Sequence, residues 1–176
     1  MTIDGPNRRK KRQPSPLDTG RLEELALAYV ARFATSAAKL ETYLKRKLRE
    51  RGWKDEGEAD PGALVARYVE LGYVDDEGFA RARAGGLLRR GYGPRRVGQA
   101  LRAAGIDEEI RGRVESGSLE HRKAALIMAR KRGFGPFAAE PPDRERREKQ
   151  IAAMLRAGHS FASARALVDA DDAAAA

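Results

Sequence analysis

Seven arginines and no acidic residue lie between residues 79 and 106, and such a cluster is suited to binding an anionic partner. The guanidinium group is planar and always charged, and its fork of donors matches carboxylate and phosphate oxygens. The cluster therefore predicts a surface that binds an anion, although charges on helices often form only a solvated face. The residues expected to bind the partner are Arg89, Arg90, Tyr92, Arg95, Arg96, Arg102, Lys131 and Arg132.

Acidic residues gather just before this cluster in the sequence. Between residues 55 and 77, eight carboxylates are accompanied by a single arginine, Arg67. Charge that is segregated in this way can orient a protein in the field of a charged partner. The two segments together favour a binding protein with one positive and one negative region.

The glycine-rich segment at residues 91–98 is not a phosphate-binding loop. Arg96 occupies the third glycine position of G-x-G-x-x-G, no strand is predicted before the segment, and Pro94 has no amide hydrogen to donate. Its glycines suit a tight turn between two helices, with Pro94 at the first position of the second helix.

No pattern in the sequence predicts an enzyme, a metal site or a cofactor. Asp75 and Asp76 fit the start of a helix better than a metal site, because the alternating oxygen ligands of a calcium loop are missing. His121 and His159 have no partner pattern, and the sequence has no nucleophile-elbow, zinc-protease or Walker motif. We therefore expect a binding protein that uses no metal and no cofactor.

The composition limits the class of protein and of partner. The chain of 176 residues has a formal net charge of +9, which favours nucleic acid or another anionic surface. It has no cysteine, so disulfides are excluded and a reducing compartment fits. No apolar run reaches the roughly 18 residues of a membrane span. The basic run at residues 8–12 is not followed by the apolar core of a secretory signal, so a cytoplasmic protein is expected.

The period of the apolar residues is helical between the two ends of the chain. Leu22, Ala26, Tyr29 and Phe33, for example, fall on one face of a first helix. No stretch alternates with a period of two, so the expected fold class is all-α, an elongated tandem array of about three three-helix units. The expected divisions are a disordered basic arm over residues 1–20, units over 21–73, 74–115 and 116–170, and a disordered tail over 171–176.

The starts of three predicted helices repeat along the chain. Aligning Ser36, Gly93 and Ser160 also aligns apolar residues four and eight positions later. Repeated helical units bury their faces against their neighbours and form extended, curved surfaces. The alternative, that helices near glycines merely look alike, accounts less well for the matching apolar positions.

Two segments closely resemble the RecX family of recombination regulators. They are LGYVDDEGFA at residues 71–80 and RGYGPRRV at residues 90–97, and the resemblance extends over roughly residues 22–169. It implies a bacterial cytoplasmic protein, built of tandem three-helix units, that binds the RecA filament on single-stranded DNA. It further implies inhibition of the ATPase, strand-exchange and coprotease activities of RecA, which would modulate recombinational DNA repair and the SOS response.

The resemblance is weaker in the last unit and at one position of the second. Ala104 stands where the family usually has a lysine or an arginine, and AGH at residues 157–159 replaces the usual arginine–glycine–aromatic turn. Family members are not enzymes and need no cofactor, which agrees with the absence of catalytic motifs. We expect the chain to be a monomer.

Two other functions remain open on the residues alone. A three-helix unit with a basic helix can dock in a groove of nucleic acid, so the chain could bind DNA directly and act without RecA. It could also be a scaffold for another acidic protein. Whether binding requires RecA separates the first alternative from the RecX prediction.

Overall fold

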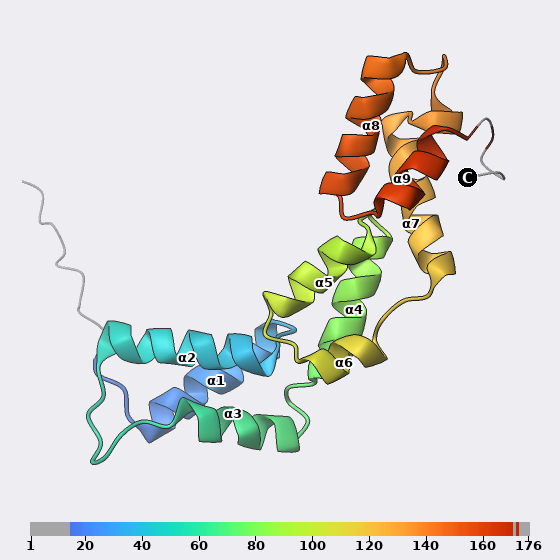
Figure 1. The fold of residues 1–176 in the computed structure, drawn as a ribbon. Coiled ribbons are helices and arrows are strands. Elements are labelled where there is room, and N and C mark those ends of the chain that lie inside the picture. The colour runs from blue at the N-terminus through green and yellow to red at the C-terminus, as the bar shows by residue number, and fades with distance from the viewer. Residues whose placement is uncertain (1–14, 171, 173–176) are drawn as a thin grey trace, which may run out of the picture.

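The computed structural model describes residues 15–170 and 172, which form an extended, bent array of helices (Figure 1). The expected all-α class is confirmed, because these residues form nine α-helices and one 3-10 helix and no strand. Within the described residues, no helix combines the length and the apolar character needed to cross a bilayer. In chain order the elements are α1 Thr19–Arg32, α2 Ala37–Arg51, α3 Pro61–Glu70, α4 Asp76–Leu88, α5 Pro94–Arg102, α6 Glu108–Arg113, α7 Ser118–Arg132, the 3-10 helix η1 Gly135–Phe137, α8 Arg144–Arg156 and α9 Phe161–Val168.

Short polar side chains fix where most of the helices begin. Each satisfies an amide group that the first turn of a helix leaves without a partner in the helix itself. Asp75, for example, accepts a hydrogen bond from the Gly78 amide over 2.8 Å, the capping role that the sequence predicted for it. The residues that accept such a bond from the third residue of their helix are Asp18, Ser36, Asp60, Asp75, Asp107, Asp143 and Ser160.

Each group of three helices has a hydrophobic core of its own. Helices α1 to α3 enclose a core that includes Leu40 and Leu44. Helices α4 to α6 bury Leu101 and Ile106, and α7 to α9 bury a third cluster around Met154. The described residues thus form three separate cores, and the units are joined by the packing of α4 on α7 and by contacts at turns and helix starts.

The first unit begins earlier than the sequence predicted. Leu17 is fully buried, and its backbone pairs with the segment that follows α2. Its amide donates to the Gly52 carbonyl over 2.9 Å, and its carbonyl accepts from the Lys54 amide over 3.0 Å. The basic arm expected over residues 1–20 is therefore too long, because a buried leucine anchors the chain. Residues 1–14 of that arm lie outside the described residues, as does most of the expected tail.

The third unit differs from the other two in the order of its helices. Ser36 and Gly93 begin the second helix of their units, whereas Ser160 begins α9, the third helix of its unit. Helices α8 and α9 thus correspond to the first two helices of the other units, and α7 precedes them and packs on α9. The alignment made from the sequence therefore holds for the helix starts but not for the helix order.

Candidate partner-binding site

Helices α4 and α5 are joined by a tight turn that carries several of the predicted binding residues. Gly91 has a φ of +89°, a conformation that glycine adopts at little cost. The Tyr92 amide donates to the Leu87 carbonyl over 3.1 Å and closes the turn. Pro94 then starts α5, so the glycine-rich segment is a helix–helix turn, as the sequence predicted.

This turn is also where the second unit meets the third. The Gly93 amide donates to the Ala157 carbonyl over 2.9 Å, and the Arg95 amide donates to the Gly158 carbonyl over 3.1 Å. A β-carbon on Gly93 would lie 2.4 Å from backbone atoms of Gly158, so a larger residue does not fit unless the backbone shifts. The turn between α8 and α9 therefore packs directly against the turn between α4 and α5.

The buried polar side chain at this junction is His159, for which the sequence predicted no role. It is 1% exposed, and its Nε2–H donates to the Gly91 carbonyl oxygen over 2.9 Å. Burial lowers the pKa of His159, the bond to Gly91 opposes that shift, and the nearby His121 adds to it. The imidazole is therefore neutral at pH 7, with its proton on Nε2.

The first and second units meet through polar contacts at the start of α2. The Ser36 hydroxyl donates to the Ala104 carbonyl over 2.5 Å, and the Ala37 amide donates to the Asp76 carboxylate over 2.8 Å. Burial raises the pKa of Asp76, the bond from Ala37 opposes the rise, and two neighbouring aspartates add to it. Asp76 belongs to α4 but lies at the N-terminus of α2, where a negative charge is favourable.

Two neighbouring hollows, centred on the second unit, share Arg90 and Tyr92 among their lining residues. One has a volume of about 470 Å³ and lies along α4 and α5, and the other, of about 200 Å³, lies between the turn and α7. No aspartate or glutamate among the described residues lines either hollow. Together we call them the basic groove, whose charged and aromatic lining residues are Lys39, Arg83, Arg90, Tyr92, Arg96, Lys131 and Arg132.

The positive charge of the basic groove is not neutralised by its neighbours. None of its six cations takes part in an ion pair within the described part of the chain. Arg90 donates instead to the Gly86 carbonyl over 3.0 Å, and its guanidinium lies 5.9 Å from the centre of the Tyr92 ring. The Lys39 ammonium lies 5.1 Å from the centre of the Phe79 ring. Backbone and aromatic contacts therefore hold Arg90 and Lys39 in place without cancelling their charges.

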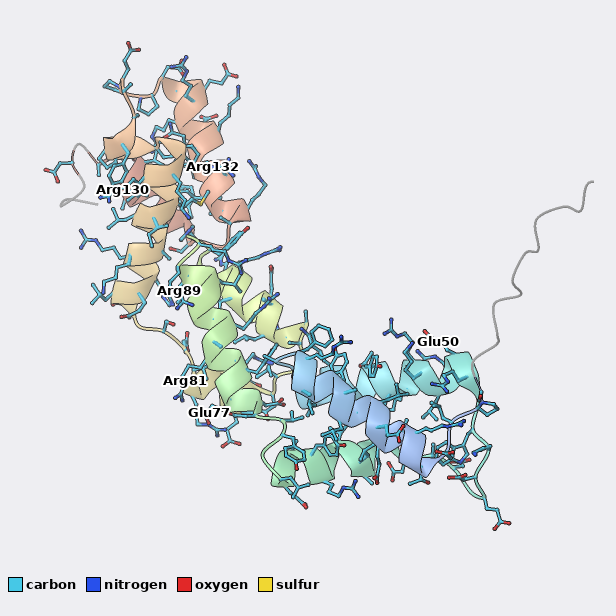
Figure 2. The ribbon with its side chains drawn as sticks, turned by 180° about the vertical axis from the view of Figure 1, so that it is seen from behind. Glu50, Glu77, Arg81, Arg89, Arg130 and Arg132 are labelled. Carbon is cyan, nitrogen blue, oxygen red and sulfur yellow. The ribbon has the colours of Figure 1, made fainter. Side chains whose placement is uncertain are left out.

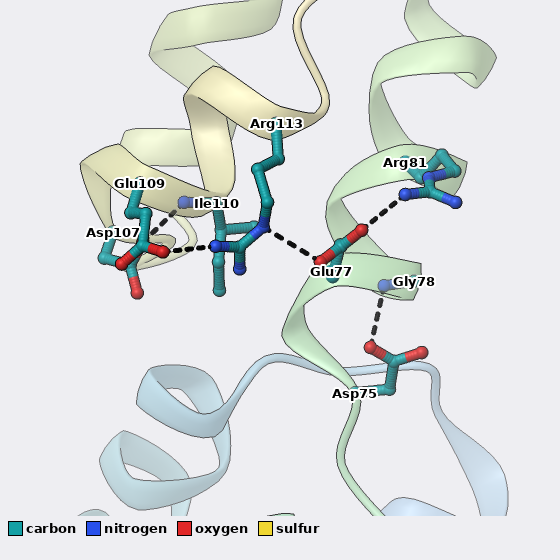
Figure 3. Close-up of polar contacts among 8 residues, drawn as sticks. All are labelled: Asp75, Glu77, Gly78, Arg81, Asp107, Glu109, Ile110 and Arg113. Carbon is teal, nitrogen blue, oxygen red and sulfur yellow. Dashed lines mark hydrogen bonds and ion pairs between the residues drawn. The ribbon is translucent and has the colours of Figure 1, made fainter.

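Arg81, another of the seven clustered arginines, lies outside the basic groove and is paired. Its guanidinium donates to Glu77, which also accepts from Arg113 over 3.1 Å (Figure 3). Arg113 in turn donates to Glu109 over 2.6 Å. The pair between Glu77 and Arg113 ties α4 to α6, whereas Arg81 is paired within α4 and does not line the basic groove.

The structure brings five of the eight predicted binding residues together on one surface. Those that line the basic groove are Arg90, Tyr92, Arg96, Lys131 and Arg132. Arg95 and Arg102 line a different hollow on another side of α5. Arg89 lines none of these three hollows. Its side chain lies beside Gly85, at the end of α4 that faces the third unit (Figure 2).

Two cations of the basic groove were not among the predicted residues. Arg83 precedes Leu87 of α4 by four residues and Arg90, just after α4, by seven, a helical spacing that could have revealed it. Lys39 comes from α2 of the first unit, and no sequence signal places it beside α5.

The chain is similar over nearly its whole length to a known regulatory protein. Regulatory protein RecX of Myxococcus xanthus (strain DK1622) is 33% identical over 181 residues, which cover 96% of this chain and 97% of that relative. This chain belongs to the RecX family. Regulatory protein RecX of Thermus thermophilus is 38% identical over 85 residues, covering 48% of this chain and 56% of that protein.

Two further comparisons match this chain to RecX proteins in sequence and in fold. A family model described as the second three-helix domain of RecX matches residues 75–113, which include all of α4, α5 and α6. The crystal structure of RecX from Lactobacillus salivarius superposes with a TM-score of 0.67 at 16% identity, covering 85% of this chain and 93% of that one. The resemblance to the RecX family that the motifs predicted is thus confirmed.

Proposed function

We propose that this RecX-family chain binds the RecA filament assembled on single-stranded DNA and inhibits its ATPase, strand-exchange and coprotease activities. Such inhibition modulates recombinational DNA repair and the SOS response. The basic groove carries the proposal, because its six cations face no carboxylate. In this proposal the chain is a cytoplasmic monomer that acts by occupying the filament, without catalysis and without a cofactor.

The chemistry of the basic groove suits an assembly that presents phosphates and carboxylates. A charge-assisted hydrogen bond from arginine to such a group contributes roughly 1.5–3 kcal/mol when it is desolvated. An exposed ion pair contributes only about 0–1 kcal/mol. Cations that line a hollow lose more water on binding than cations on a convex surface, so the groove-lining arginines are expected to contribute most.

The shape of the array suits a partner with repeated sites. The cations of the basic groove come from all three units, with Lys39 on α2, Arg83 on α4 and Lys131 on α7. An extended ligand can contact several protomers of a filament at once, and each added contact is then intramolecular. The affinity of the array can therefore exceed that of one unit by roughly 10²–10⁴.

The direct test is the rate of ATP hydrolysis by RecA on single-stranded DNA as increasing amounts of the chain are added. We expect the wild-type chain to inhibit, and Arg90→Glu/Arg96→Glu to inhibit roughly tenfold less, a loss of about 1.4 kcal/mol. The matched control is Arg144→Glu/Arg146→Glu, which reverses two exposed charges in the first turn of α8. Acidic residues suit the start of a helix, so this control should fold. Equal losses in both variants would assign the effect to net charge, and no inhibition by the wild type would overturn the proposal.

The same groove also supports a second function, direct binding of DNA without RecA. Tyr92 is 38% exposed in a surface lined by cations, so a base can stack on its ring while arginines contact the phosphates. Fluorescence anisotropy of labelled single-stranded DNA in the absence of RecA separates the two functions. Tight binding to naked DNA, together with relief of RecA inhibition by excess DNA, would favour the second function. Weak binding that is lost at moderate salt would favour the first.

A further inference from the structure

Large apolar side chains lie exposed on the first unit, next to its junction with the second. Phe33 and Tyr73 are each 55% exposed, although aromatic side chains of this kind are usually buried for the most part. Together with Val30 and Phe79 they line a hollow of about 480 Å³ between the ends of α1 and α3 and the first turns of α4. We call this hollow the junction pocket.

The two exposed rings are held in place by other aromatic side chains. The Phe33 ring centre lies 5.3 Å from that of Tyr29, and the Tyr73 ring meets the Tyr68 ring edge-on at 5.4 Å. Because each ring packs against another ring, the exposed part of each is preorganised and loses little conformational freedom on binding. Rigid aromatic side chains around a hollow are typical of the anchor points of protein–protein interfaces.

One wall of the junction pocket is positively charged. Arg83 lines both the junction pocket and the basic groove, and no ion pair within the described residues involves it. Asp75 also lines the pocket, but its carboxylate is engaged as the N-cap of α4. A ligand that fills the pocket with an apolar side chain can therefore place an adjacent carboxylate beside Arg83.

We infer that the junction pocket docks a surface segment of a RecA protomer that presents an apolar side chain next to a carboxylate. This inference rests on the proposed function and deepens it, because it assigns recognition of protein to the junction pocket and attraction to anionic groups to the basic groove. Nucleic acid fits the pocket poorly, since its phosphates would meet one arginine and an otherwise mostly apolar lining. The basic run at residues 8–12 of this chain also fits poorly, because it would face the like charge of Arg83.

Two variants test the junction pocket from different sides. Tyr73→Ser removes an exposed ring, and Ala82→Glu, at an exposed position of α4 that lines the pocket, adds a longer side chain there. We expect each variant to inhibit the RecA ATPase at least roughly tenfold less than the wild type, while its binding to naked DNA stays unchanged. Phe161→Ser is the matched control, because that aromatic residue is 56% exposed on α9 of the third unit.

Thermal melts show whether a variant has lost its fold. If Tyr73→Ser melts earlier, Ala82→Glu still reports on the pocket, because it leaves the packing of the first unit untouched. Normal inhibition by a folded Ala82→Glu would overturn the inference and leave the proposed function intact. Failure of the wild type to inhibit would overturn both.

The identity of the occupant is tested separately by photocrosslinking. A p-benzoylphenylalanine in place of Tyr73 is irradiated in the presence of RecA filaments on single-stranded DNA. We expect a covalent adduct with the RecA protomer. An adduct with DNA, a dimer of this chain or the absence of any adduct would overturn the inference.

Discussion

The imidazole of His159 donates a buried hydrogen bond of 2.9 Å to the carbonyl oxygen of Gly91, across the junction between the second and third units. His159 belongs to the turn before α9 and Gly91 to the turn before α5, so this bond joins two turns that are far apart in the sequence. The basic groove depends on the junction, because the junction places the cations of α7 beside Arg90.

We expect the contact between the second and third units to weaken in mild acid. The pKa of His159 is lower in the folded state than in the unfolded chain, so the unfolded state takes up a proton first as the pH falls. The stability contributed by the neutral imidazole is thus fully present above about pH 6.5 and is lost as the pH falls through the folded-state pKa. Thermal melts between about pH 8 and about pH 5 measure the loss. His159→Gln keeps a donor that does not titrate. If the melting temperature of the wild type and that of His159→Gln depended equally on pH, the prediction would be contradicted.

Gly93→Ala should destabilise the chain by roughly 1–3 kcal/mol, the usual cost of overpacking a closed contact. Its added carbon would lie 2.4 Å from backbone atoms of Gly158, which cannot rotate away as a side chain can. Gly112→Ala on α6 is the matched control, because no heavy atom lies within 4 Å of the added carbon. Alanine there should stabilise the helix by up to about 1 kcal/mol. Denaturant titrations compare the two variants, and an unchanged midpoint for Gly93→Ala would mean that the two turns do not touch in solution.

Reversal of charge should matter on one side of α5 more than on the other. Arg96 lines the basic groove, whereas Arg95 lines the separate hollow. We expect Arg96→Glu to weaken inhibition of the RecA ATPase by up to roughly tenfold, or about 1.4 kcal/mol, and Arg95→Glu to weaken it much less. Both side chains are exposed, so neither variant should change the melting temperature. Equal losses would show that the partner contacts both sides of α5.

Removal of the third unit should weaken inhibition and leave the rest of the chain folded. A chain that ends at Val114 keeps the first two hydrophobic cores but loses Lys131 and Arg132. We expect measurable binding to RecA filaments and far weaker inhibition, because the contacts of an extended ligand are no longer combined. Circular dichroism checks the fold and the ATPase assay checks inhibition. Full inhibition by residues 1–114 would instead assign the activity to the first two units.

Deletion of residues 1–14 should lower affinity for the filament at low salt and change it little near physiological ionic strength. The five consecutive basic residues at 8–12 act through long-range attraction, which salt screens. The deletion should stop there, because the Ser15 carbonyl accepts from Arg51 over 2.9 Å and Leu17 is buried. Filament binding measured across a salt series provides the test. A loss that persists at every salt concentration would make this segment a specific contact.

The sequence by itself determined the helices and the family. Apolar residues that recur on one face, and short polar residues such as Ser36 and Asp75 at helix starts, act over a single turn or a few turns of backbone. The motifs at residues 71–80 and 90–97 are equally local, so they were sufficient to predict membership of the RecX family. The order of helices in the third unit was not predicted, because a helix start carries no information about which neighbour the helix packs on.

Only the tertiary structure decided which charges act together. Arg95 and Arg96 are adjacent in the sequence, but successive residues of an α-helix point about 100° apart, so they line different hollows. Lys39 joins the basic groove only because the start of α2 packs against the second unit, and His159 is buried only because two distant turns meet. Such contacts depend on how helices from different units cross, and the periodicity of any one helix does not encode that.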